Sequence, residues 1–172
     1  MVAKITSGVS VYGALYYNQE KVDKGKARTL GWNRIMERPD GTAGIPECMR
    51  SFEAYLAANR RTEKPVIHLS FNPHPDDRLS DGQLEAIGRE YMETLGYGDQ
   101  PYIIFRHEDN ARPHIHIVSL RIDEQGRKIR DYKEWERSMK ICRELEQKYG
   151  LVPSMKEERK VSSATTPVDY RK

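Results

Sequence analysis

The chain has 172 residues, 32% of them charged, and a formal net charge of +3. This length suits one domain with its own core. No run of residues approaches the roughly 20 apolar residues of a membrane span. The opening stretch MVAKITSGVS lacks the apolar core of a secretory signal. Cys48 and Cys142 lie far apart, so we expect reduced thiols and exclude a disulfide scaffold or a zinc motif built on cysteine.

In chain order, the first predicted elements are a strand and two helices. Residues 2–8 predict a strand, and residues 11–22 predict a helix with apolar side chains on one face. Residues 23–44 are basic and interrupted by glycine and proline, so we expect an irregular, partly exposed segment. Residues 46–61 predict a second helix, because Pro46 suits its first turn and apolar residues recur at helical spacing.

The middle of the chain predicts a strand followed by a third helix. Residues 65–72 alternate between two sets of side chains, which is typical of a strand. Ser80 and Gln83 form a capping box at the start of the helix. The helix is expected to end at Gly96 or Gly98, because glycine readily adopts the left-handed conformation found after a helix.

The remaining residues predict two neighbouring strands and a last helix. Residues 101–107 and 112–123 predict strands that the short turn between them must place side by side. Residues 124–132 could close a further hairpin, and Asp131 is expected to cap the last helix.

This order of elements predicts an α+β fold, an antiparallel β-sheet with helices packed against one face. We assign residues 1–152 to this domain. Residues 153–172 are a polar C-terminal segment that could lead into a further region of a longer parent protein.

The stretch HEDNARPHIHIV, residues 107–118, holds three of the five histidines. His114 and His116 are two residues apart on a predicted strand, so both side chains leave the same face. A hairpin over the turn would bring His107 beside them. Three converging imidazoles form a metal site with open positions, as in catalytic centres, whereas an ordinary group of solvated or core histidines is the alternative. Asp109 could accept a hydrogen bond from an imidazole N–H.

The pattern of His107, Asp109, His114 and His116, with Pro113 before the pair, resembles the third motif of relaxases. These are mobilisation nucleases of plasmids and of conjugative or mobilisable transposons, within the wider class of HUH endonucleases. The stretches GALYYNQEKV, HLSFNPHPDDRLSDGQL and ELEQKYGL are also similar to that family. The resemblance spans residues 2–152 and implies the ferredoxin-like arrangement of the HUH sheet.

The resemblance implies a site- and strand-specific DNA nickase. A tyrosine would attack a phosphodiester of single-stranded or locally melted DNA at an origin of transfer, form a 5′-phosphotyrosine link and later rejoin the strand. His107, His114 and His116 would hold one divalent ion, magnesium or manganese in the cell or another first-row ion. Accessory mobilisation proteins and a bacterial cytoplasmic location are also implied.

Two adjacent tyrosines compete for the role of nucleophile. Tyr16 and Tyr17 both lie off the apolar face of the first helix, so periodicity does not decide between them. In the family, the tyrosine is usually followed by two or three residues and then Lys or Glu-Lys. Tyr17 before NQEK matches that pattern better, so we predict Tyr17, with Tyr16 as the alternative, and assign Asp109 a catalytic role beside it.

Several side chains are predicted to contact the DNA strand. Arg112, in the turn between the histidines, is the best single candidate for a phosphate contact. The other candidates are Lys21, Lys24, Arg28, Arg34, His68 and Ser70. Acidic residues are interleaved with these, so an ordinary solvated surface is the alternative for each cluster.

Two other functions remain open at this stage. One is a metal-dependent hydrolase in which three histidines activate water and no tyrosine is needed. The other is a DNA-binding module that recognises an origin but does not cleave it. Covalent attachment of DNA to the protein would distinguish the nickase from both.

Overall fold

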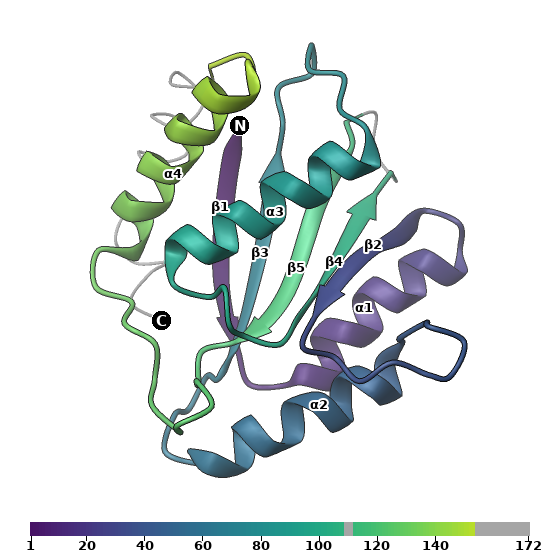
Figure 1. Ribbon diagram of the computed structural model, residues 1–172, viewed down its shortest axis with the longest axis vertical. Coiled ribbons are helices and arrows are strands. Elements are labelled where there is room, and N and C mark those ends of the chain that lie inside the picture. The colour runs from purple at the N-terminus through teal and green to yellow at the C-terminus, as the bar shows by residue number, and fades with distance from the viewer. Residues whose placement is uncertain (109–111, 154–172) are drawn as a thin grey trace.

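The computed structural model describes residues 1–108 and 112–153. One five-stranded sheet, in the order β1-β3-β5-β4-β2, runs through the molecule, and all neighbouring strands are antiparallel (Figure 1). The strands are β1 (Val2–Gly8), β2 (Ala27–Asn33), β3 (Val66–Asn72), β4 (Tyr102–His107) and β5 (His114–Leu120). The helices are α1 (Val11–Asp23), α2 (Ile45–Ala58), α3 (Asp81–Leu95) and α4 (Glu134–Tyr149). The predicted α+β class and antiparallel sheet are confirmed.

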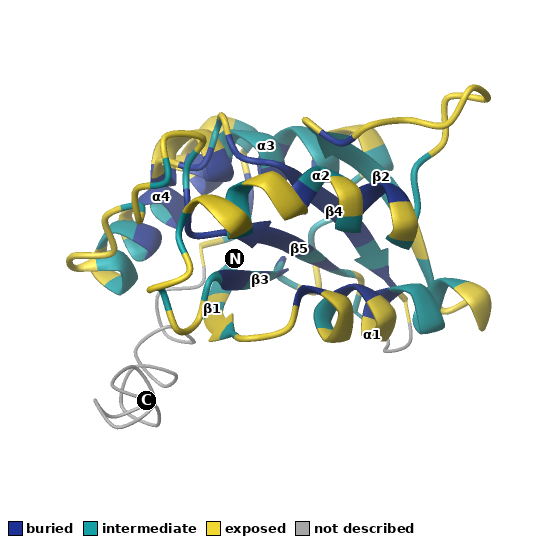
Figure 2. Ribbon diagram, turned by 90° about the horizontal axis from the view of Figure 1, so that it is seen from below, coloured by how far each residue is buried: buried dark blue, intermediate teal, exposed yellow. Residues whose placement is uncertain are grey.

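The sheet buries an apolar cluster on each of its faces. Ile104 and Ile117 belong to a cluster with α3 and α4, whereas Phe105 and Val118 belong to a second cluster with α1 and α2. Figure 2 shows α3 and α1 on opposite sides of the sheet. The prediction that helices cover only one face was wrong. Because β4 and β5 carry apolar side chains on both faces, each face needs its own cover.

The expectation of an irregular segment over residues 23–44 was wrong for its first part, which contains β2. This edge strand pairs with β4 alone, and its register shifts between Thr29 and Gly31. The shift interrupts the alternation of side chains by which a strand is recognised in a sequence. β2 therefore owes its conformation to hydrogen bonds from β4, a partner that lies far along the chain.

The predicted ends of α3 are confirmed, but the start of α4 differs from the prediction. Ser80 and Gln83 form the capping box, and Gly96 ends α3 in the left-handed conformation. Asp131 does not cap α4: its carboxylate pairs with Lys128 at 3.0 Å, and the N-cap of the helix is Lys133. Residues 124–132 close a hairpin, as predicted, through a single bridge between Ile122 and Lys128, and no named strand lies there. No helix in the described part of the chain is long and apolar enough to cross a membrane.

Candidate functional site

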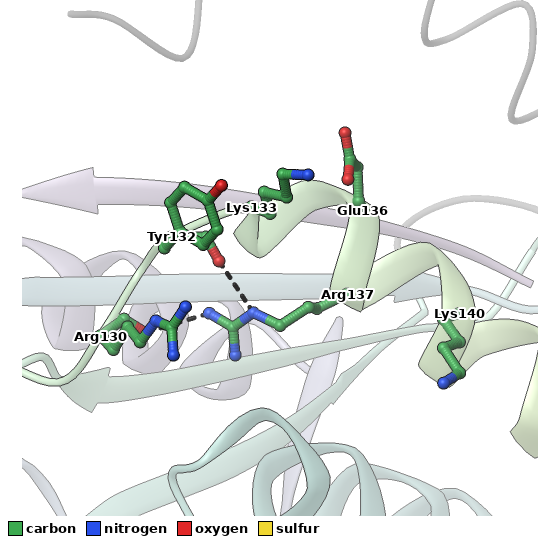
Figure 3. Close-up of a pocket in the computed structure, with 6 residues that line it drawn as sticks. All are labelled: Arg130, Tyr132, Lys133, Glu136, Arg137 and Lys140. Atoms are coloured by element: carbon green, nitrogen blue, oxygen red, sulfur yellow. Dashed lines mark hydrogen bonds between the residues drawn. The ribbon is translucent and has the colours of Figure 1, made fainter.

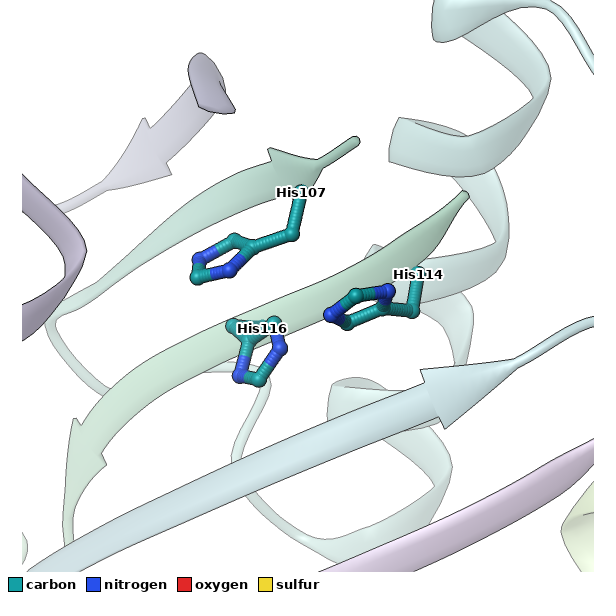
Figure 4. A group of neighbouring side chains, drawn as sticks. All are labelled: His107, His114 and His116. Carbon is teal, nitrogen blue, oxygen red and sulfur yellow. The ribbon is translucent and has the colours of Figure 1, made fainter. Parts of the chain in front are cut away.

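The three histidines of the motif converge on the α1 face of the sheet, at the end of β4 and the start of β5 (Figure 4). His107 is the cross-strand partner of His114, so the predicted hairpin arrangement is confirmed. The ring centroid of His107 lies 3.9 Å from that of His116 and 5.3 Å from that of His114. One nitrogen atom from each ring lies within 4.8 Å of the others, so the group could hold a metal ion.

Two hydrogen bonds determine where the ring protons of His107 and His114 lie. The amide of Asn18 donates to the Ala14 carbonyl at 2.8 Å, so its Oδ1 accepts from Nε2 of His107 at 2.7 Å. The Arg112 carbonyl, which can only accept, lies 3.2 Å from Nδ1 of His114. The nitrogens that can bind a cation are therefore Nδ1 of His107 and Nε2 of His114.

The third imidazole, His116, is positioned by a fourth histidine. Nδ1 of His116 lies 3.0 Å from Nε2 of His68 on β3, and the two ring centroids are 5.0 Å apart. Burial, and then the nearby ammonium of Lys4, lower the pKa of His68. His68 is therefore neutral at neutral pH, so it can hold the orientation of His116 without repelling a cation.

The donor set fits a divalent first-row cation. Metal–nitrogen bonds are about 2.0–2.1 Å long, so small ring movements would bring the three nitrogen atoms onto one ion. Three protein ligands leave positions for water and for a substrate oxygen, unlike a closed structural site. Imidazole suits transition metals better than magnesium, which prefers oxygen ligands.

Helix α1 presents its tyrosines at different distances from the histidines. Val11 and Leu15 are buried and anchor the helix on the sheet. The Tyr17 ring stacks on His107 with centroids 6.0 Å apart, while Tyr16 stacks on Tyr12 at 5.8 Å. All three tyrosines remain about half exposed, at 48% for Tyr17, 51% for Tyr16 and 54% for Tyr12. Of the two candidate nucleophiles, only Tyr17 has a ring contact with the histidine group among the described residues.

Besides His68, three of the predicted DNA contacts lie near the histidines. Nζ of Lys21 lies 5.8 Å from the centre of the Tyr17 ring. Ser70 is the cross-strand partner of His116. Arg112 precedes His114 by two residues and donates a hydrogen bond to the Pro73 carbonyl at 2.7 Å. Asp109, predicted to be catalytic, lies outside the described residues.

The remaining basic candidates are engaged elsewhere. Arg28 lies on the α3 face of β2, where its guanidinium binds both carboxylate oxygens of Asp81 at 2.8 Å. Arg34 follows the far end of β2 and lies 3.4 Å from Asp99. Lys24 pairs with Glu20 at 2.6 Å on the exposed surface of α1. Each of these three is paired with a carboxylate, and a role in DNA contact stays a prediction.

Asn18 is a site residue that the sequence interpretation missed. It is fully buried against His107, although asparagine is usually exposed. The available signal was its position: it follows Val11 and Leu15 at helical spacing on the face that packs against the sheet. A polar residue at a core position needs a buried partner, and here the partner is an imidazole.

We expect Asn18→Leu to weaken metal binding by about 10- to 100-fold, the usual effect of losing a group that orients a histidine ligand. Leucine has a similar volume but cannot accept the hydrogen bond from Nε2 of His107. The measurement is a metal titration followed by calorimetry. Gln19→Leu, one position along the same helix, is the matched control and should bind metal normally. Unchanged affinity in Asn18→Leu would show that His107 needs no such partner.

Comparison with known protein families matches residues 17–151 to a family described as "Relaxase: MobA/VirD2-like, nuclease domain". The matched region includes Tyr17, all three clustered histidines and every helix and strand from β2 to α4. No curated protein matches the chain.

Proposed function

Because the chain belongs to the MobA/VirD2-like relaxases, we propose that it is a site- and strand-specific nickase for DNA at an origin of transfer. It would act in the bacterial cytoplasm together with accessory mobilisation proteins. The observation that carries this proposal is the position of Tyr17, on α1, with its ring stacked on His107 of the three-histidine group. A hydroxyl nucleophile beside a candidate metal site is the combination that phosphodiester transfer requires.

The proposed reaction exchanges one phosphodiester for another. The Tyr17 hydroxyl loses its proton and its oxygen bonds to phosphorus, while the bond from phosphorus to the 3′ oxygen breaks. The leaving oxygen takes up a proton and becomes a 3′-OH. The protein remains joined to the 5′-phosphate, and attack by a 3′-OH reverses the step without an external energy source.

The side chains around Tyr17 can each assist this exchange. The Lys21 ammonium, 5.8 Å from the tyrosine ring, would stabilise the phenolate that forms. A cation held by His107, His114 and His116 would polarise a non-bridging phosphate oxygen. Asn18 and His68 keep the imidazoles in place, so little reorganisation is needed when the substrate arrives.

Beside the histidines, the same face of the sheet is exposed along β1. Lys4 and Thr6 of β1 are cross-strand partners of Ser70 and His68, so they lie on the same face as the histidines, and both are exposed. This uncovered polar strip carries a positive charge near the candidate metal site. It supports the proposal that a DNA strand approaches across β1 and β3.

The test of the proposed function uses labelled single-stranded origin DNA, a divalent metal and a denaturing gel. A labelled band that migrates with the protein supports the nickase. A released 5′-phosphate with repeated turnover and no attached protein would favour the water-activating hydrolase. Binding without any cleavage would favour the non-cleaving module.

We expect cleavage of single-stranded or supercoiled, locally melted origin DNA, and much slower cleavage of relaxed linear duplex. A tyrosine held on a helix beside fixed histidines needs an unpaired, pliable strand to bring the phosphate to it. Binding should weaken steeply with salt, because phosphate contacts release counterions. The measurement is the initial nicking rate on the three DNA forms. Equal rates on relaxed duplex and single strand would contradict the expectation.

A further inference from the structure

A second basic surface lies at the start of α4. A hollow of about 400 Å³ is lined there by Arg130, Tyr132, Lys133, Glu136, Arg137 and Lys140 (Figure 3). We call this set of residues the α4 basic patch. It contains four positively charged side chains and one carboxylate, so its charge is strongly positive although the whole chain carries only +3.

The α4 basic patch lies far from the histidine group in the fold. α4 packs through Ile141 and Leu145 on the sheet face that also carries Ile117. His116, one residue before Ile117, points to the opposite face. The mechanism proposed above makes no use of the patch, and one phosphate cannot touch both sites.

Arg137 holds the backbone of the loop before α4 in place. The guanidinium donates to the carbonyls of Tyr132 at 2.9 Å and of Arg130 at 3.0 Å. Arg121 is buried and pairs with Glu134 at 2.8 Å, which secures the first turn of α4. The loop before the helix therefore presents its side chains from a fixed frame.

Three cations of the patch have no carboxylate partner among the described residues. Arg130, Lys133 and Lys140 are exposed, and the first two lie 5.1 Å and 5.6 Å from the centre of the exposed Tyr132 ring. Arg28, by contrast, is paired with the carboxylates of Asp81 and Glu108. A cluster of unneutralised cations repels itself, and a polyanion that covers it relieves this repulsion.

We propose that the α4 basic patch binds the phosphate backbone of duplex DNA, at a point away from the strand that is cut. The partner follows from chemistry: the lining is charged apart from one tyrosine, whereas the centre of a protein interface is apolar and depleted in charge. A duplex is favoured over a single strand because its phosphates are dense and held on a stiff rod, which suits several cations carried by one fixed loop and helix.

The identity of the polyanion as DNA rests on the proposed function, but the test does not. It measures binding of the intact chain to a duplex unrelated to any origin, over a range of salt concentrations. The variant R130Q/K133Q is compared with R60Q/R61Q, which removes two exposed arginines after α2. Arg137 is left in place, because it holds the loop.

We expect R130Q/K133Q to bind the duplex at least about tenfold more weakly at about 0.1 M salt, with the slope of log K against log salt reduced by about 1.8, or about 0.9 for each lost phosphate contact. R60Q/R61Q should stay within about twofold of the parent. Nicking of a single strand should be unchanged in R130Q/K133Q. That result separates this inference from the proposed function, since either can fail while the other holds.

Three outcomes would overturn the inference. The first is an unchanged duplex affinity in R130Q/K133Q, and the second is an equal loss in R60Q/R61Q. The third is a loss for single-stranded DNA of the same length without a loss for the duplex. If duplex binding is unchanged while binding to polyglutamate is lost, the patch fits an acidic protein instead. Matched thermal melting curves will show that the variants are folded.

Discussion

Replacing His114 and His116 together by alanine is expected to abolish metal binding and DNA cleavage while leaving most DNA binding. These two side chains supply two of the three imidazoles whose nitrogens lie within 4.8 Å of one another. One remaining histidine cannot hold a divalent ion in competition with water. Affinity for DNA depends mainly on basic side chains, which the variant keeps. The measurements are metal content after gel filtration, nicking activity and DNA binding.

His74→Ala is the matched control for the histidine variant. His74 lies in the loop after β3 and contacts Asp76, so it is a histidine outside the metal group. It should retain metal and nicking activity. Removing the metal with a chelator should reproduce the loss of cleavage in the parent, and adding first-row ions one at a time should identify which of them restores it. Stoichiometric metal and normal nicking in the double alanine variant would refute the assignment.

Tyr17→Phe is expected to eliminate the covalent protein–DNA adduct without loss of fold, metal or DNA binding. The substitution removes one oxygen from a half-exposed side chain, so stability should change little. Without that oxygen no phosphotyrosine can form at this position. The stacking of the ring on His107 survives in phenylalanine. The measurement is the adduct band on a denaturing gel, with binding followed separately.

Tyr16→Phe is the matched control on the same helix, since Tyr16 stacks on Tyr12 and has a similar exposure. It should form adduct at close to the parent rate. If Tyr16 is the nucleophile, the results of the two variants will be exchanged. Mass spectrometry of the digested adduct gives an independent answer: a nucleotide on the peptide position of Tyr17 supports the assignment. A nucleotide on any residue outside 12–17 would overturn the placement of the nucleophile on α1.

The sequence was sufficient for features that depend on neighbours along the chain. His114 and His116 had to share a face because side chains alternate along a strand. His107 had to lie close to them because a short turn places the two strands that it joins side by side. Ser80 and Gln83 predicted the start of α3 for the same reason, since a capping box lies within one helical turn.

Only the tertiary structure decided which side chains meet from distant parts of the chain. The segment after α1 becomes β2 because β4, about 70 residues later, supplies its hydrogen bonds. Tyr17, not Tyr16, contacts His107, and Asn18 meets the same ring, because α1 packs on the sheet through its buried face. Arg28 and His107 are both near the β2–β4 edge, yet they lie on opposite faces. Periodicity indicates which face of its own helix or strand a residue occupies. The packing of the helices on both faces of the sheet, which is driven by burial of apolar side chains, determines which residues lie against that face.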